Sequence, residues 1–311
     1  MKAIVLKEFG STDKLVVQEV PVPIIQEEEV LVKVSAISVN PVDVYTRLGK
    51  GLAARYQDEH PMILGWDISG EVIASKSPLL NEGQQVFGMV NFPGLGRAYA
   101  EYVAAPAGHL ALKPENISYE EAAAATLAAL TAWQALTRYM PITAGRKILI
   151  HAAAGGVGHY AVQIAKYLGA QVSGTASAAN QEVVLGLGAD EFIDYKTPAL
   201  SGHAADFDYV LDTIGGDNID LSLQIMKPGS TIISLVGGQR EVLAAKAEAK
   251  GMTGLVMGVA SNGADMQRLA ELLQQGAVRS LVSHAFSFDQ MPQAHQQVES
   301  HRTVGKVVVQ A

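Results

Sequence analysis

Cysteine is absent from the 311 residues of the chain. Disulfide bonds, thiolate metal ligands and a catalytic thiol are therefore excluded, because each of them needs a cysteine sulfur. The composition is compatible with a reducing compartment, and we expect a cytoplasmic protein.

Charged residues are also scarce. They make up only 17% of the chain, the formal net charge is −8, and no block of five like charges occurs. Basic surfaces that bind nucleic acid or anionic lipid are therefore not expected.

Long apolar runs are missing as well. The apolar run near the N-terminus extends only from Ala3 to Leu6, which is too short for the core of a signal peptide. The longest apolar stretch, around Ala122–Trp133, is shorter than the ~18–20 residues that cross a bilayer. No membrane partner is expected.

Apolar residues nevertheless make up 49% of the chain, which is enough for a globular core. A single core stops growing at about 250–300 residues, so the length predicts two domains. The first hundred residues contain short β-branched runs at 14–20 and 29–37, separated by proline and glycine turns. They predict an irregular β domain.

The pattern changes after Ile117. Ser118 followed by Glu120 and Glu121 is a typical helix start, and an alanine-rich stretch over 120–136 predicts one long helix. Apolar strands at 147–153, 170–175, 208–213 and 231–237 then alternate with helical stretches. This alternation predicts a parallel sheet covered on both faces. Helices at 266–276 and 290–300 and strands at 284–288 and 305–311 follow.

The clearest chemical motif lies between the first two of these apolar strands. Residues 153–158, Ala-Ala-Gly-Gly-Val-Gly, fit G-x-G-x-x-G with alanine first. Gly155 allows the backbone to approach a pyrophosphate, Gly158 allows close packing of helix on strand, and a helix beginning near Val157 directs its N–H groups at the phosphates. We expect Ala154 and Gly156 to line the same site. The alternative is a purely structural strand-to-helix turn.

The end of the next strand bears on the choice of cofactor. NAD-binding sites usually place an Asp or Glu about 20 residues after the glycine motif, where it binds the ribose 2′-hydroxyl. In this chain Ser177 stands in that region, and no acidic residue follows it before Glu182. Ser177 can donate to a 2′-phosphate, which favours NADPH. Tyr195 and Lys196 either contribute to this site or are exposed loop residues.

The chain resembles the medium-chain dehydrogenase/reductase superfamily, and within it the zinc-free quinone oxidoreductase (zeta-crystallin-like) branch. The resemblance lies in a series of motifs: NPVDVY (40–45), GWDISGEV (65–72), GQQVFG (83–88), AYAEYVAAP (98–106), EEAAAATLAALTAWQAL (120–136), AAAGGVG (152–158), LGADEFIDY (187–195) and the terminal GKVVV.

The resemblance implies an α/β protein with a GroES-like β domain and a Rossmann domain, a doubly wound parallel sheet. We expect the GroES-like catalytic domain over 1–121 and 263–311 and the Rossmann domain over 122–262. The active site would lie between them, and the assembly would be a homodimer.

One departure from the superfamily concerns zinc. Asn40 and Trp66 stand where zinc-dependent members have a cysteine and a histidine ligand. His60 and His109 are expected to be surface or loop residues. No metal site is therefore expected, and alcohol oxidation would lack its electrophile. A quinone or other conjugated carbonyl needs less help, since conjugation spreads the developing charge.

The resemblance also implies roles for single residues. Asn40 and Tyr45 would line the nicotinamide end, with Tyr45 relaying a proton, although Asn40 also suits a turn before Pro41 and Tyr45 also suits packing. The remaining residues expected to bind cofactor are Thr131, Gly215 and Gly237. Asp43 and Asp67 resemble structural turns and are given no acid–base role.

We therefore expect an NADPH-dependent oxidoreductase that reduces quinones or other conjugated carbonyls. One alternative is an enoyl-thioester or alkenal reductase of the same superfamily. Another is a non-catalytic NADPH-binding protein.

Overall fold

A computed structural model describes residues 1–203, 205–238 and 240–311. The chain forms two compact units, residues 1–130 with 259–311 and residues 131–258. One division falls inside helix α3 (Leu127–Gln134), nine residues after the expected boundary at 121/122. The other falls after residue 258, four residues before the expected boundary at 262/263. No helix in the described ranges is both long and apolar enough to cross a membrane.

The unit formed by 131–258 is built on a six-stranded parallel sheet. Its strand order is β10-β9-β8-β11-β12-β13, the 3-2-1-4-5-6 order of dinucleotide-binding folds. The strands are β8 (Lys147–Ile150), β9 (Gln171–Ala176), β10 (Glu191–Asp194), β11 (Phe207–Asp212), β12 (Met226–Ser234) and β13 (Thr253–Val256). The order reverses between β8 and β11, so the loops after these two strands flank the position where such sheets bind ligands.

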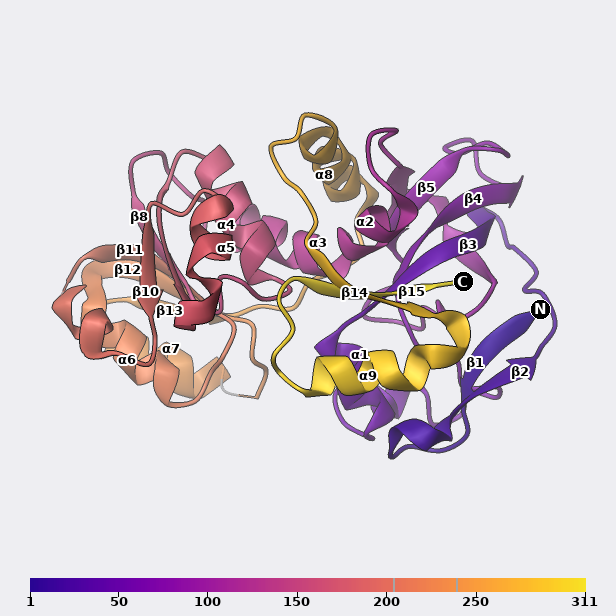
Figure 1. The fold of residues 1–311 in the computed structure, drawn as a ribbon, viewed down its shortest axis with the longest axis horizontal. Helices are drawn as coiled ribbons and strands as arrows, with labels where there is room; N and C mark the ends of the chain where they lie inside the picture. The colour runs from indigo at the N-terminus through magenta and orange to yellow at the C-terminus, as the bar shows by residue number, and fades with distance from the viewer. Residues whose placement is uncertain (204, 239) are drawn as a thin grey trace. The chain divides into compact units, whose positions relative to one another are not determined.

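Helices cover both faces of this sheet, as the alternating pattern predicts. In Figure 1, α4 (Gly158–Tyr167) and α5 (Gln181–Gly186) lie on one side, and α6 (Asp217–Ile225) and α7 (Arg240–Glu248) on the other. Leu149, Val210 and Ile232 of the central strands pack with Leu223 and Leu243 of the helices in one buried cluster. Burial of apolar residues on both faces explains why these strands have no alternating polar pattern.

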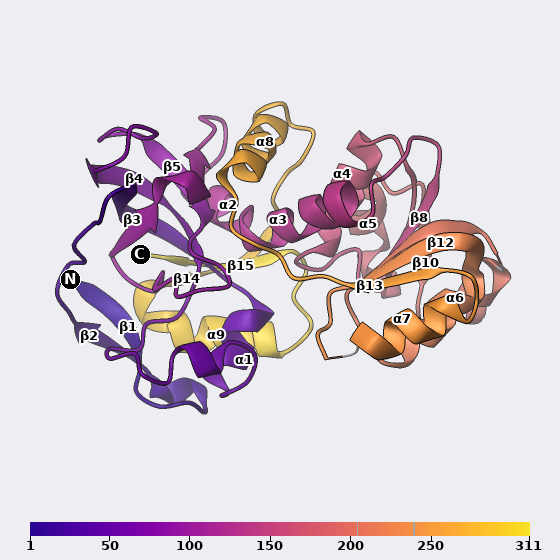
Figure 2. The same ribbon diagram turned by 180° about the vertical axis from the view of Figure 1, so that it is seen from behind.

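The other unit contains a seven-stranded sheet of order β14-β15-β3-β4-β5-β7, with β6 paired to β3, and a separate β1–β2 pair (Figure 2). Its strands are β1 (Lys2–Leu6), β2 (Leu15–Glu19), β3 (Glu29–Val39), β4 (Asp67–Ser75), β5 (Gln85–Met89), β6 (Tyr102–Pro106), β7 (Leu110–Leu112), β14 (Val282–Ser287) and β15 (Lys306–Gln310). Strand β15 runs antiparallel to β3, so the end of the chain completes a sheet begun near residue 29. Its helices are α1 (Pro41–Arg47), α2 (Tyr119–Ala124), α8 (Gly263–Gln274) and α9 (Met291–Glu299).

The single long helix expected over 120–136 is wrong. The chain forms α2, breaks at Ala125–Thr126, continues as α3 and ends in a π-helical turn over 135–139. The Thr126 hydroxyl donates to the Ala123 carbonyl at 2.7 Å, and the buried Asp67 carboxylate accepts from the Leu127 N–H at 3.1 Å. These side-chain bonds satisfy backbone groups that a continuous helix would pair internally.

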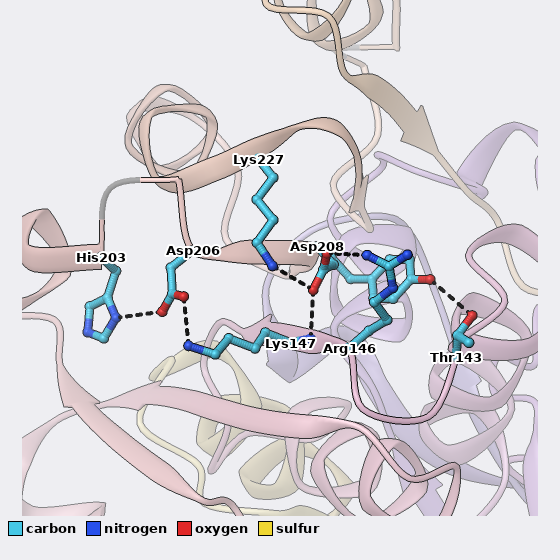
Figure 3. A network of polar contacts seen from close by, with 8 residues as sticks. Thr143, Arg146, Lys147, His203, Asp206, Asp208 and Lys227 are labelled. Carbon is cyan, nitrogen blue, oxygen red and sulfur yellow. Dashed lines mark hydrogen bonds and ion pairs between the residues drawn. The ribbon is translucent and has the colours of Figure 1, made fainter.

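Ion pairs connect the strand starts at the amino edge of the parallel sheet (Figure 3). Asp208 accepts from Arg146 at 2.9 Å, from Lys227 at 3.0 Å and from the Lys147 N–H at 3.0 Å. Asp206 accepts from the Lys147 ammonium at 2.6 Å. Partial burial acts to raise the pKa of Asp208, but its three donors together hold that pKa below the ordinary value. Asp208 therefore ties the starts of β8, β11 and β12 together.

We expect Asp208→Asn to lower the free energy of unfolding by about 1–3 kcal/mol at neutral pH, because charge-assisted bonds to a largely buried carboxylate are lost. The contribution of a carboxylate with a lowered pKa is present above its unfolded pKa and is lost as the pH falls through the folded one. Urea unfolding of both proteins at neutral and acidic pH measures this. Asp206→Asn is the matched control: its pair is more exposed and should contribute about 1 kcal/mol or less. Equal effects of the two substitutions would contradict the assignment.

Candidate functional site

The turn from β8 into α4 brings helix and strand unusually close. A Cβ atom on Gly158 would lie 2.1 Å from the Ala152 carbonyl oxygen and 2.8 Å from the Ala153 Cα. Both neighbours are backbone atoms and cannot move aside, so only glycine fits. This is the close helix–strand packing that the glycine motif predicts.

Gly155 differs from Gly158 in what surrounds it. A Cβ atom there would lie 3.1 Å from the Ala152 carbonyl oxygen, which a slight shift would relieve, and in ordinary contact with the Ala152 Cβ at 3.8 Å. Gly155, Gly156 and Val157 are partly exposed, whereas Ala154 is buried. Val157, which precedes α4, provides no side-chain cap for the helix. The Gly155 N–H donates to the Ala152 carbonyl at 2.8 Å within the turn. A partly exposed turn that leads into a helix without a side-chain cap fits a pyrophosphate group.

Ser177 and Tyr195 follow neighbouring strands. The parallel register pairs Ala176 with Asp194, so the next residue of each strand lies at the same edge of the sheet. The Ser177 hydroxyl accepts from the Asn180 amide at 3.3 Å and keeps its own proton to donate. Tyr195 is 59% exposed, and the Lys196 ammonium lies 6.0 Å from its ring centroid. The structure thus brings a hydroxyl donor and a cation to the end where an adenosine phosphate is expected.

Two loops at the same carboxyl edge carry the other predicted glycines. Gly215 follows β11 with φ +75°, and Gly237 follows β12 and is exposed. A Cβ atom on Gly215 would lie 3.1 Å from the Val236 side chain, so the two loops are in contact. Thr131, expected near the nicotinamide, is buried in α3.

His151, directly after β8, is a buried polar residue at the centre of this edge. Its Nε2 lies 3.0 Å from the Ser222 hydroxyl and its Nδ1 lies 3.1 Å from the Thr175 hydroxyl. Ser222 donates its only proton to the Asn218 carbonyl at 2.7 Å, so Nε2 must carry the histidine proton and Nδ1 accepts from Thr175. Burial lowers the pKa of His151 to about 4, against the opposing charge of Asp212. The ring is therefore neutral near pH 7.

In the other unit, Asn40 lies at the start of α1, directly before Pro41. Its side chain is 1% exposed; its Nδ2 donates to Asp67 at 2.7 Å, and its Oδ1 accepts from the Lys306 ammonium. Its backbone N–H donates to Asp43 in a capping box at the start of α1. The Asn40 amide is thus bonded at both ends inside the protein.

Asp43 and Asp67 are also fully buried in this cluster. Burial, together with the charge of Asp67, raises the pKa of Asp43 to about 7. Burial raises the pKa of Asp67 to about 6, against the lowering effects of Lys306 and Asn40. Burial lowers the pKa of Lys306. The carboxylates hold backbone and amide groups in place, in line with the structural role expected for them.

Tyr45 lies on α1 and is 47% exposed. Trp66 is fully buried, and its indole N–H donates to the Gly94 carbonyl at 2.7 Å. His60 is exposed, and His109 is half-buried and accepts from the Asn91 N–H. Within the described residues, no group of three potential metal ligands is found.

Sequence reasoning missed three residues: His151, Lys306 and Asp212, the last residue of β11. Each sits at or next to an end of a largely apolar strand, in KILIH, GKVVV and DYVLD. A charged or titratable residue at the end of a buried strand was the available signal, since such residues are rarely buried without partners.

The pKa of His151 predicts an acid-dependent loss of stability. Its contribution is complete above the unfolded pKa of about 6.5 and is lost as the pH falls towards the folded value, a change of up to about 3 kcal/mol. We expect wild type to lose this much stability relative to His151→Gln between about pH 7.5 and 4.5, measured by urea unfolding. A pH-independent difference between the two proteins would contradict a buried neutral histidine.

Comparison with family models gives two matches. Residues 26–115 match an alcohol dehydrogenase GroES-like domain, and residues 187–309 match a zinc-binding dehydrogenase model. The second description names zinc, although the chain has no cysteine and Trp66 occupies a predicted ligand position.

Individual proteins match over nearly the whole chain. A 2-methylene-furan-3-one reductase from Solanum lycopersicum and a chloroplastic NADPH-dependent alkenal/one oxidoreductase from Arabidopsis thaliana are each 34% identical, over 99% of this chain and 79% of theirs. The solved structure of a quinone oxidoreductase from Coxiella burnetii covers 100% of this chain and 99% of its own, with a TM-score of 0.94 and 34% identity. With this sheet order, this glycine turn and these relatives, the chain belongs to the medium-chain dehydrogenase/reductase superfamily, among its quinone and alkenal oxidoreductases.

Proposed function

We propose that the chain is an NADPH-dependent oxidoreductase that reduces quinones or other conjugated carbonyls by hydride transfer without a metal. The observation that carries this proposal is the open glycine turn at the carboxyl end of β8, where the strand order reverses. The relatives with NADPH, alkenal and quinone in their names support the choice of cofactor and acceptor.

The residues of the 131–258 unit would hold the cofactor along the carboxyl edge of the sheet. The stretch Ala154–Gly158 would bind the pyrophosphate through backbone N–H groups, and Ser177 and Tyr195 the 2′-phosphate. Gly215, Gly237 and Thr131 would surround the nicotinamide. When bound, the reduced nicotinamide supplies the hydride.

Reduction also consumes a proton, and we assign its delivery to Tyr45. The hydroxyl of Tyr45, a residue that is 47% exposed, can donate to the carbonyl oxygen of the acceptor, which gains negative charge as hydride arrives. Asn40 would influence this proton transfer indirectly, through the position of Tyr45. Because its amide is held by Asp67 and Lys306, it fixes the start of α1 and so the helix that carries Tyr45.

A conjugated acceptor suits a site without zinc. Delocalisation over the ring of a quinone or over an enone stabilises the developing enolate, so no Lewis acid is required. The enone named for the tomato relative and the quinone named for the Coxiella protein belong to this class. An enoyl thioester of the same class is the alternative acceptor.

We also propose a cytoplasmic homodimer. The absence of cysteine suits a reducing compartment. Strand β13 lies at the edge of the parallel sheet, where a second copy could extend the sheet by pairing.

The proposed function is tested by NADPH oxidation with a benzoquinone, an alkenal, an enone, an enoyl thioester and a saturated ketone. We expect turnover with the conjugated carbonyls, none with the saturated ketone, and no loss after treatment with a chelator. Tyr45→Phe should lower kcat by roughly 100-fold, the scale of a lost general acid, with little change in NADPH affinity. If NADPH binds but no acceptor is reduced, the protein is a non-catalytic binder and the proposal fails.

Cofactor preference should depend on Ser177. A hydrogen bond to a charged group contributes about 1.5–3 kcal/mol, so wild type should prefer NADPH over NADH by roughly 10- to 100-fold. In Ser177→Asp a carboxylate would repel the 2′-phosphate and reverse the preference. The measurement is kcat/KM for both cofactors with one quinone. Ser173→Asn serves as a control that should keep the NADPH preference. Ser173 is a buried residue of β9, the strand that Ser177 follows, and its hydroxyl donates to Glu191. A wild type that prefers NADH would rule out this role for Ser177.

A further inference from the structure

Asp212 is a fully buried carboxylate that binds the loop after β11. Its Oδ1 accepts from the Asn218 amide at 2.9 Å and from the Ile214 N–H at 3.2 Å. The Gly215 N–H lies between the two oxygens, 3.2 Å from Oδ1 and 3.0 Å from Oδ2. The left-handed turn at Gly215 is therefore wrapped around this one side chain.

The same carboxylate also binds the loop after the neighbouring strand. Ser234, the last residue of β12, donates its hydroxyl to Asp212 Oδ2 at 2.7 Å, and the same hydroxyl accepts from the Val236 N–H at 3.3 Å. The Leu235 N–H donates to the Asp212 backbone carbonyl at 2.9 Å. Residues 234–236 are thus held by Asp212 through both its side chain and its backbone.

Direct packing couples the two loops further. A Cβ atom at Gly215 would lie 3.1–3.2 Å from the Val236 side chain, so the Gly215 backbone rests against Val236. A shift of either loop must therefore move the other. These donors to the Asp212 side chain are all neutral groups, so hydrogen bonds rather than an ion pair fix the orientation of the carboxylate.

Strands β11 and β12 belong to the second half of the 3-2-1-4-5-6 sheet, the half opposite the glycine turn after β8. Ligands bind outside the carboxyl ends of such strands, with one mononucleotide on each half. We infer that Asp212 is the positioning residue for the nicotinamide half of the cofactor, acting through the loops that carry Gly215 and Gly237. This inference rests on the proposed function, because it assumes a bound dinucleotide.

Asp212→Asn is the direct test, since it keeps the shape of the side chain but adds an N–H₂ group. With the amide nitrogen at the Oδ1 position, the Ile214 and Asn218 donors lose their acceptor. With the nitrogen at the Oδ2 position, it faces the Gly215 N–H, and the Ser234 hydroxyl must give up its donated bond. Either orientation therefore weakens contacts to at least one loop. Asp208→Asn is the matched control: it changes the same residue type on the same strand at the amino edge (Figure 3). Both variants should lose stability, but only Asp212→Asn should disturb the loops.

The readout is binding of two ligands, measured by fluorescence or calorimetry. NADPH spans both halves of the sheet, whereas 2′,5′-ADP reaches only the adenosine half. We expect Asp212→Asn to weaken NADPH binding by at least roughly tenfold, about 1.4 kcal/mol, and to leave 2′,5′-ADP binding within about twofold. Asp208→Asn should leave both affinities at the wild-type value.

Ser234→Ala is a second variant that removes only the hydroxyl link to the β12 loop, and its milder change guards against misfolding of Asp212→Asn. It should weaken NADPH selectively, and amide hydrogen exchange at Val236 should accelerate in the absence of any ligand. Parallel losses for NADPH and 2′,5′-ADP, or unchanged NADPH affinity with faster exchange, would overturn the inference. If wild type binds neither ligand, the proposed function itself is wrong.

Discussion

The close approach of Gly158 to the Ala152 carbonyl is the constraint on which the cofactor half of the protein depends. Because glycine has no Cβ atom, α4 can begin directly above the end of β8; any larger residue at position 158 would collide with the Ala152 carbonyl oxygen. That position puts an uncapped helix N-terminus at the reversal of strand order, where its dipole favours an anion. Packing alone does not explain the glycine at position 155, because the fold leaves almost enough room there for a side chain. Gly158 is therefore required by packing, whereas we propose that Gly155 is required by the ligand.

Buried carboxylates organise irregular backbone in both units by the same physical means. Asp67 accepts from the Leu127 N–H where the alanine-rich segment breaks and also holds the Asn40 amide. Asp212 accepts from the loops after β11 and β12. Unpaired backbone N–H groups are costly when buried, and a carboxylate with several acceptor sites can satisfy a number of them at once. The loops that result are shaped by one side chain each, which makes that side chain sensitive to substitution.

The sequence predicts the periodic parts of this structure and misses the parts set by contacts distant in the chain. Strands such as β8 and β11 appear as apolar runs because they are buried on both faces, and the glycine turn appears through its spacing. The break at Ala125–Thr126 was missed because its partner, Asp67, lies about sixty residues earlier. The pairing of β15 with β3 was similarly invisible to local patterns, and only the family resemblance accounted for it. The burial of Asn40 was missed because Lys306, which binds its amide, comes from the opposite end of the chain.

Strand β11 has an aspartate near each end, and the two edges of the sheet give them different consequences. At the amino edge Asp208 faces the cations Arg146 and Lys227, which are themselves partly exposed, so solvent partly screens the pairs. At the carboxyl edge Asp212 is fully buried and faces neutral donors from loops that leave the sheet. The same residue type therefore joins strand starts at one edge and, in our proposal, shapes the cofactor-binding loops at the other.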